Sequence, residues 1–180
     1  MMMYLFNIFL SLLLFINYNT MDYKEFENLL GKHFSFTKEV FGIDFKSTNY
    51  GTKFYTNSEY LNTEFYGIPY NFITITVNKE DIVQSITVHF QEVINRQFYD
   101  LFIKKYGEPN SIQVIENKKI ESKTLGEGFF QHLTKSSFDL REGTFEEDPL
   151  YIIWEKEHFQ VKAFLRHKNS ISEIIFSKTD

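Results

Sequence analysis

The stretch from residue 72 to residue 90, FITITVNKEDIVQSITVHF, constrains the fold more than any other part of the chain. Its apolar residues recur at every second position, which is the period of a strand with one buried face. The two alternating runs are separated by the polar loop NKED. The sequence therefore predicts an antiparallel hairpin whose buried side chains are Ile73, Ile75 and Val77, followed by Ile82, Gln84, Ile86, Val88 and Phe90.

A second group of strands is predicted near the C-terminus, in LYIIWEKEHFQVKAFLRHKNSISEIIFSK. Here the strands are expected near 150–155, 158–166 and 171–177, with Phe159, Val161, Ala163 and Leu165 alternating in the middle one. The last two strands form a hairpin of the same length and pattern as the first. Trp154 is expected to anchor the core beside it.

Two helices are predicted, one in front of each group of strands. In the first, near 22–31, Asp22 and Glu25 form a capping box and Gly31 offers a stop; its apolar stripe is Tyr23, Phe26, Leu29 and Leu30. The second ends at Gly107 and Pro109, after which a strand through Ile112 and Val114 begins. Its stripe is formed by Ile94, Phe98, Leu101, Lys105 and Phe102.

The remaining segments have weaker patterns. Residues 34–70 are aromatic and interrupted by glycines, which predicts two short strands. Residues 117–149 are polar and loop-like, although GFFQHLTKSSFDLRE has room for a strand or two. We therefore predict an α+β fold, mainly an antiparallel sheet with two helices packed on one face. The folded part is 22–180, either as two similar halves, 22–91 and 92–180, or as one irregular domain.

The first 20 residues, MMMYLFNIFLSLLLFINYNT, carry no charge and contain an apolar run from Tyr4 to Ile16. That run is too short to cross a bilayer comfortably, so we expect no stable membrane span. It resembles an export signal, but it has no basic residue before it and no small-residue cleavage site after it. The alternatives are that Met21 is the true start and that the segment is an uncleaved anchor. A periplasmic or secreted location is slightly favoured over a cytoplasmic one.

Composition excludes several classes of function. The net charge of −5 disfavours nucleic acid as a partner, because binding to phosphates requires a basic face. The absence of Cys excludes disulfides, thiolate catalysis and Cys-based zinc sites. A bias toward Phe and Tyr, with 21 and 11 residues, is typical of AT-rich codon usage and of core filling.

Residues 93–177 carry a resemblance to known proteins. A helix ending in KKYGEP, a strand, a single Trp at Trp154 and a closing hairpin follow one another, an order that resembles segments of small exported bacterial α+β proteins. The doubled plan of helix and sheet also resembles the beta-lactamase inhibitor protein fold, whose members act by occluding a partner protein. The chain departs from that family in having no Cys, and none of the family's contact residues is matched, so no functional residue is carried over.

Motifs of catalysis and of metal or cofactor binding are missing. The sequence has no phosphate loop, no nucleophile elbow and no HExxH pair, and GEGFF lacks the flanking strand and helix of a dinucleotide loop. No metal or cofactor is expected. The histidines, which have no metal-ligand spacing, are His33, His89, His132, His158 and His167. The acidic run Glu146, Glu147 and Asp148 is expected to be a solvated loop, and His132 would serve as acid or base only if the fold brought it to His158 or Glu155.

The expected function is a non-enzymatic binding module of inhibitor-like type that holds a protein partner. The alternative is a small hydrolase or other enzyme with an unrecognised histidine and carboxylate site. Tyrosine is favoured in interfaces because it joins a large rigid surface to a polar tip. The candidate protein-binding residues are Tyr50, Tyr55, Tyr60, Tyr66 and Tyr70.

Overall fold

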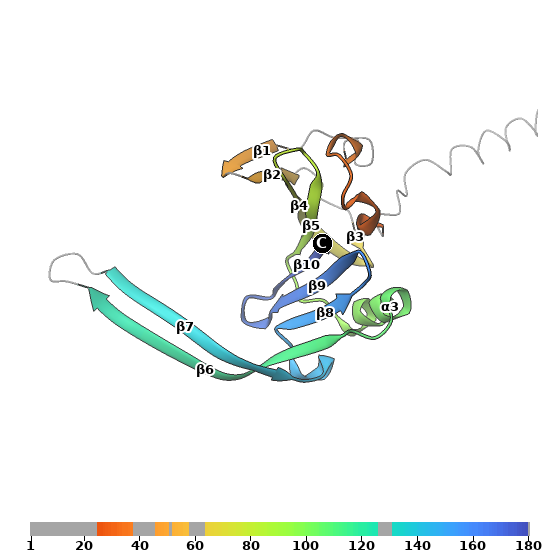
Figure 1. The fold of residues 1–180 in the computed structure, drawn as a ribbon. Coiled ribbons are helices and arrows are strands. Elements are labelled where there is room, and N and C mark those ends of the chain that lie inside the picture. The colour runs from red at the N-terminus through yellow and green to blue at the C-terminus, as the bar shows by residue number, and fades with distance from the viewer. Residues whose placement is uncertain (1–24, 38–45, 51, 58–63, 126–130, 180) are drawn as a thin grey trace, which may run out of the picture.

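The fold was obtained as a computed structural model, which describes residues 25–37, 46–50, 52–57, 64–125 and 131–179. For residues 46–50, 52–57, 120–125 and 131–136 only the backbone is described. The predicted α+β class is confirmed: an antiparallel sheet is covered on one face by helical segments (Figure 1). The helical elements that lie wholly within the described ranges are η1 (Phe26–Leu29), α3 (Arg96–Tyr106), η2 (Phe145–Glu147) and η3 (His167–Asn169).

Ten strands form one sheet in the described part of the chain. They are β1 (Lys46–Tyr50), β2 (Thr52–Asn57), β3 (Glu64–Phe65), β4 (Ile68–Val77), β5 (Val83–Phe90), β6 (Ser111–Leu125), β7 (Gln131–Glu142), β8 (Tyr151–Glu155), β9 (Phe159–Arg166) and β10 (Ile171–Lys178). Their order is β1-β2-β4-β5-β10-β9-β8-β6-β7, and β3 pairs with β4. The hairpins β4–β5 and β9–β10 thus meet at the centre of the sheet. The equivalence of the two halves, 22–91 and 92–180, stays a prediction.

The hairpin β4–β5 is confirmed, with one correction to its buried positions. Ile73, Ile75 and Val77 are buried on β4, as are Ile86, Val88 and Phe90 on β5. The register shifts between Thr76 and Val77, where Val77 pairs with Val83 rather than with Gln84. This bulge changes the alternation, because one extra residue moves the following side chains to the other face. Val83 is therefore buried in place of Ile82 and Gln84.

Helix α3 is confirmed, but its buried stripe differs from the prediction. The buried side chains are Phe98, Tyr99, Phe102 and Tyr106, whereas Leu101 is half-buried and Lys105 is exposed. The Asn95 side chain caps the first turn by accepting a hydrogen bond from the Phe98 backbone N–H (2.9 Å). Gly107 ends the helix at φ +78° and ψ −174°, a region that only glycine adopts readily. The corner at Gly107 and Pro109 is thus a stop, as predicted.

The first helix is shorter than predicted. In place of a helix over 22–31, the described residues form the 3-10 turn η1, and Asp22 and Tyr23 lie outside them. Phe26 and Leu29 are buried as expected, and Gly31 has φ +76°. Phe26 packs on Phe65, which also contacts Phe98 of α3, so η1 and α3 cover the same face of the sheet.

The largest departure from the prediction is a long arm formed by β6 and β7 (Figure 1). Residues 117–149 were expected to be loop-like, with room for a strand or two in 128–142, where β7 indeed lies. The extension of β6 to Leu125 and its pairing with β7 were not expected. Only the start of the arm joins the rest of the sheet, through the pairing of residues 111–113 with β8. The side chains described on the arm beyond its base, at 115–119 and 137–142, are exposed, so burial imposes no hydrophobic pattern there.

Trp154 is confirmed as a core anchor. It has no exposed surface, and its indole N–H donates a hydrogen bond to the Gly107 carbonyl (3.0 Å). No helix in the described ranges combines the length and the apolar character needed to cross a membrane. The apolar segment 1–20 lies outside the described residues.

Candidate functional site

The sheet has two unlike faces, and the difference is visible in adjacent rows of paired residues. One row runs across five strands through Ile73, Val88, Ile174, Ala163 and Ile152, all of them buried under the helical segments. The next row consists of residues that point to the opposite face, since side chains alternate along a strand. This second row, which we call the open-face row, is Phe72, His89, Glu173, Phe164 and Tyr151.

The first half of the open-face row is centred on His89. The Phe72 ring stacks on the imidazole with a centroid distance of 4.2 Å and an interplanar angle of 22°. His89 Nε2 lies 3.0 Å from the Thr74 hydroxyl, and Nδ1 lies 3.6 Å from a carboxylate oxygen of Glu173. Burial lowers the pKa of His89 below its ordinary value; Glu173 opposes this effect and Arg166 adds to it. Burial therefore favours the neutral form of the imidazole in the folded protein.

The second half of the row joins aromatic rings to cations. Tyr151 and Phe164 stack with a centroid distance of 5.1 Å and an interplanar angle of 25°. Lys162 Nζ lies 4.3 Å from the Tyr151 centroid, and Arg166 Cζ lies 4.6 Å from the Phe164 centroid. Arg166 also lies 3.6 Å from Glu173, which connects the two halves. The result is a half-exposed platform of rings with positive charge at its edge.

An apolar patch on the arm continues this platform. Three of the four exposed large apolar side chains in the described part of the chain are Ile115, Phe138 and Leu140, with exposed fractions of 42%, 41% and 38%. Gln113 pairs with Tyr151 on one side and with Glu142 on the other, so the open-face row extends into the arm. Ile115 pairs with Leu140, and Phe138 lies two residues away on the same face.

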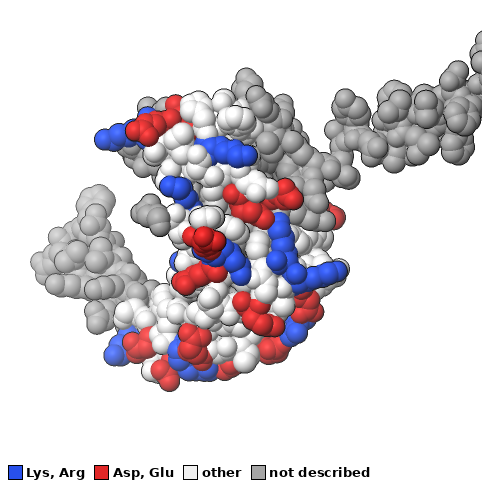
Figure 2. Space-filling view, turned by 45° about the vertical axis from the view of Figure 1, so that its right-hand side comes forward, with Lys and Arg blue, Asp and Glu red and all other residues white. Residues whose placement is uncertain are grey.

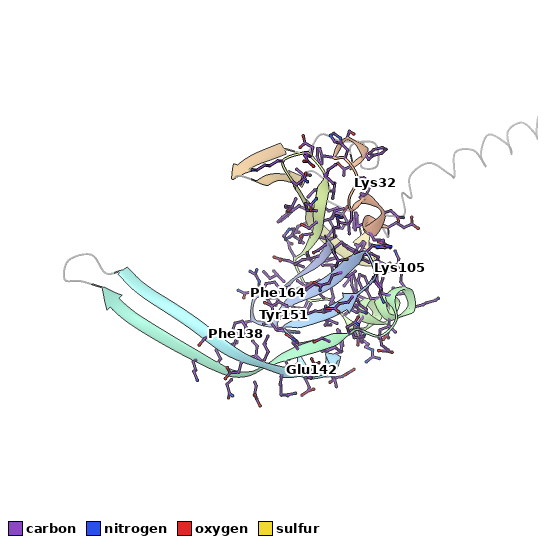
Figure 3. All side chains as sticks on the ribbon, in the orientation of Figure 1. Lys32, Lys105, Phe138, Glu142, Tyr151 and Phe164 are labelled. Atoms are coloured by element: carbon purple, nitrogen blue, oxygen red, sulfur yellow. The ribbon has the colours of Figure 1, made fainter. Side chains whose placement is uncertain are left out.

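The figures agree with this placement. In Figure 3, Phe138 on the arm and Tyr151 and Phe164 on the sheet lie on one side of the molecule, and Lys32 and Lys105 lie on the other. Figure 2 shows that charges of both signs are interspersed over the visible face. We use the name open face for the open-face row together with the patch of Ile115, Phe138 and Leu140.

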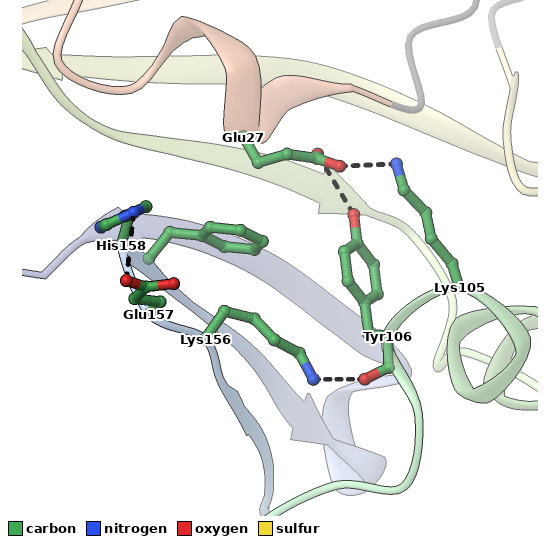
Figure 4. A pocket seen from close by; sticks show the side chains of 7 residues that line it. Glu27, Lys105, Tyr106, Lys156, Glu157 and His158 are labelled. Atoms are coloured by element: carbon green, nitrogen blue, oxygen red, sulfur yellow. Dashed lines mark hydrogen bonds and ion pairs between the residues drawn. The ribbon is translucent and has the colours of Figure 1, made fainter.

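A cavity of about 400 Å³ lies on the other side of the molecule, near the end of α3 (Figure 4). Its lining residues are Glu27, Lys105, Tyr106, Lys156, Glu157, His158 and Phe159.

The polar groups of this cavity connect elements of the fold. Glu27 accepts hydrogen bonds from Lys105 (2.7 Å) and from the Tyr106 hydroxyl (3.2 Å), which attaches η1 to α3. Burial, with a smaller contribution from Glu27, raises the pKa of Tyr106. Lys156 donates to the Tyr106 carbonyl at the end of the helix. These contacts give the cavity a structural role.

The acidic run at η2 is also used in structural contacts. Glu146 pairs with Arg96, Glu147 pairs with Arg141 (2.6 Å), and Asp148 lies 3.5 Å from His167. The Arg141 hydrogen bond holds the pKa of Glu147 below its ordinary value, assisted by the capping box with Thr144. Within the described ranges, no group of three His, Asp or Glu side chains is arranged to hold a metal ion.

The structure does not bring His132 to His158 or Glu155. The backbone of His132 pairs with Thr124 far out on the arm, whereas β8 pairs only with the first residues of β6. The separation along β6, from Ser111 to Thr124, is roughly 40 Å at the usual rise of a strand. His158 is exposed and lies 3.7 Å from Glu157, and the His33 ring lies 2.9 Å from the Ser35 hydroxyl.

His89 lies between a hydroxyl and a carboxylate, as the base of a catalytic triad does. In such a triad Thr74 would be the nucleophile and Glu173 the acid that orients the base. Catalysis of acyl transfer also needs donors for the developing negative charge. The backbone N–H groups of β4 and β5 are occupied by pairing on both sides. Lys162 lies three strands away from Thr74 along its row. The arrangement therefore lacks the group that would stabilise a transition state.

The five tyrosines predicted to bind a protein are placed as follows. Tyr70 is buried at 6% exposure, and Tyr66 is half-buried with its ring against Phe98 and Phe102. The backbones of Tyr50 and Tyr55 lie on β1 and β2, but their side chains are not described, and Tyr60 lies outside the described residues. Their proposed role in binding stays a prediction.

Sequence reasoning missed the aromatic residues of the open face. They can be identified as aromatic residues at the strand positions that alternate with the buried ones. Phe72 alternates with Ile73 and Ile75, and Phe164 alternates with Ala163 and Leu165. An aromatic ring at such a position faces away from the core.

No known protein family matches the sequence, and no curated protein matches it. One solved structure similar to this chain is that of an extracellular protein containing a SCP domain from Bacillus anthracis str. Ames. It aligns with 89% of this chain at 12% identity and a TM-score of 0.46. The present chain spans about half of that protein, 47% of its length.

Proposed function

We propose that the protein is a non-enzymatic binding module that holds a protein partner against its open face. The observation that carries this proposal is the continuity of Phe164, Tyr151, Ile115, Leu140 and Phe138 from the centre of the sheet into the arm. Large exposed apolar areas rimmed by polar groups are typical of protein interfaces, and aromatic residues and Arg are enriched in them.

A photo-crosslinking amino acid placed separately at Phe138 and at Phe164 tests the proposal. We expect both positions of the full chain to capture the same protein from the native host, and Lys104 on α3 to capture nothing above background. Unlabelled wild-type chain should compete with the capture, and a folded Phe164→Ala chain should compete at least about tenfold less well. Equal capture from Lys104, or equal competition by Phe164→Ala, would refute the proposal.

A second candidate function is a hydrolase that uses Thr74, His89 and Glu173. The distances of 3.0 Å and 3.6 Å favour it, and the missing oxyanion donors disfavour it. Purified protein should be assayed on a panel of chromogenic esters and peptides. Turnover that is lost in both Thr74→Ala and His89→Gln would establish this function, and turnover that survives both changes would exclude the site.

Export is a separate part of the proposal and is supported only by the apolar segment 1–20. N-terminal sequencing of the protein purified from cell and culture fractions tests it. A mature chain that begins near Asp22 outside the cytoplasm supports export, whereas an intracellular chain that begins at Met21 contradicts it.

A further inference from the structure

The charges on the open face are unlike the charge of the whole chain. The chain has a net charge of −5, yet Lys118, Lys162 and Arg166 all lie on this face. Within the described residues Lys162 contacts the Tyr151 ring and has no ion-pair partner, and Lys118, opposite Phe138, has none either. Lys118 and Lys162 are therefore available to a ligand, whereas Arg166 is shared with Glu173.

Two carboxylates of the open face, Glu173 and Glu142, contact other groups of the protein. Glu173 lies 3.6 Å from both His89 and Arg166. Glu142 accepts hydrogen bonds from the Ser111 hydroxyl (2.9 Å) and from the Ile112 backbone N–H (3.3 Å). Glu155 lies at the far end of β8, four positions beyond Tyr151. Glu142 keeps its charge, because both of its donors are neutral. Around Tyr151 and Phe164, however, Lys162 and Arg166 face the single carboxylate of Glu173, and this local excess of positive charge complements negative charge.

The apolar groups alternate with these cations across the face. Neighbouring strands lie about 4.8 Å apart, and residues two apart on a strand lie about 7 Å apart. The path from Phe164 through Tyr151 to Ile115 and Phe138 is therefore roughly 20 Å long. An extended chain of about six to eight residues covers that distance.

We infer that the open face binds an acidic polypeptide segment that carries aromatic or aliphatic side chains. The carboxylates of such a segment meet Lys118, Lys162 and Arg166, and its apolar side chains pack on Tyr151, Phe164 and the patch of the arm. This inference rests on the proposed function and specifies the partner's contacting chemistry. Single-stranded nucleic acid shares negative charge and flat rings with such a segment, and it serves as a competing outcome in the test.

Fluorescence anisotropy with labelled peptides of about twelve residues, long enough to span the face with a margin, tests the inference on the full chain. The first peptide is rich in Glu, Phe and Leu; the second has Lys in place of each Glu; the third has Ser in place of each Phe and Leu. An oligothymidine of the same length is the fourth probe. We expect the first peptide to bind at least about tenfold more tightly than the others, and added salt to weaken it.

The variant Lys118→Glu/Lys162→Glu should bind the first peptide about tenfold more weakly, or worse, than the wild type does. Its matched control is Lys32→Glu/Lys104→Glu, which makes the same change in net charge on the other side and should leave binding unchanged. Circular dichroism checks that both variants are folded. The variant Arg166→Gln is a milder second test, because it removes a positive charge without adding a negative one beside Glu173. It should weaken the binding of the first peptide.

Equal binding of the Lys peptide, unchanged binding by Lys118→Glu/Lys162→Glu, or tighter binding of the oligothymidine would overturn the inference. If crosslinking at Phe164 and Phe138 still identifies one protein in that case, the proposed function stands and only the partner's chemistry is wrong. If that crosslinking fails as well, both are wrong.

Discussion

The two faces of the central sheet share the same strands and the same pairing, yet they differ in burial and in the chemistry of their side chains. Val88, Ile174 and Ala163 are fully buried on one face. The residues one position away, His89, Glu173 and Phe164, are polar, charged or aromatic and remain partly exposed. Because the period of a strand is two, one set of strands can hold a stabilising surface and a binding surface at once. The covered face is expected to determine stability, and the open face is expected to determine binding.

The largest effect expected on the covered face is that of Trp154→Ala. Trp154 is fully buried, and its indole also satisfies the Gly107 carbonyl at the end of α3. The change should lower the free energy of unfolding by about 3 to 5 kcal/mol, as is usual for a buried aromatic residue. Urea unfolding measures this loss. A loss below about 1 kcal/mol would mean that the covered face is not the main source of stability.

A smaller effect is expected at Gly143, where the arm leaves the covered face. A Cβ atom at this position would lie 2.7 Å and 2.9 Å from the two methyl groups of Val114, which is 2% exposed. Gly143→Ala should therefore lower the free energy of unfolding by about 1 to 3 kcal/mol through overpacking. Combining it with Val114→Ala should remove most of this added loss in a double-mutant cycle. Additive losses would contradict the close contact.

At the end of α3, Gly107→Ala should lower the free energy of unfolding by roughly 1 to 2 kcal/mol, because φ is +78° and a side chain is disfavoured there. The neighbouring change Glu108→Gln affects an exposed side chain and should alter stability by less than about 0.5 kcal/mol. Binding by the open face should survive both changes in folded protein. A loss of binding in Glu108→Gln would make this corner a site.

On the open face, His89 should make stability depend on pH in one direction. Its pKa in the folded state lies below the ordinary value of 6.5, mainly because of burial. Well above pH 6.5 the imidazole is neutral in both states. As the pH falls toward and below 6.5, the unfolded chain binds the proton first, so wild-type stability falls on acidification. His89→Gln removes this contribution. Urea unfolding from pH 7.5 to 5 should therefore show a steeper fall for wild type, and parallel curves would contradict the lowered pKa.

The covered face was predictable because burial imposes a pattern. The alternation through Ile73, Ile75 and Val77 predicted β4, and Gly107 with Pro109 predicted the end of α3. The bulge beside Val83 was not predictable, since nothing in the composition of NKEDIVQ indicates an extra residue in the pairing. The full length of the arm was missed for a related reason, because its described side chains, at 115–119 and 137–142, are exposed and burial imposes no pattern on them.

The open face was only partly predictable. A protein-binding surface on the sheet was expected, but the candidate residues were taken from the tyrosine-rich segment, where Tyr70 is in fact buried. The row from Phe72 to Tyr151 depends on the relative register of five strands, which one sequence does not reveal. The aromatic residues Phe72 and Phe164 could be recognised because they alternate with the buried residues of their strands, but the alignment of the row across the sheet could not.

The central claim, that the covered face stabilises and the open face binds, is tested most directly by two matched changes, Phe98→Ala and Phe164→Ala. Each should be measured by urea unfolding and, in folded protein, by competition against the crosslink formed from Phe138. We predict that Phe98→Ala loses about 3 to 5 kcal/mol and competes like wild type, while Phe164→Ala loses less than about 1 kcal/mol and competes at least tenfold less well. Equal destabilisation by the two changes, or wild-type competition by Phe164→Ala, would contradict the account.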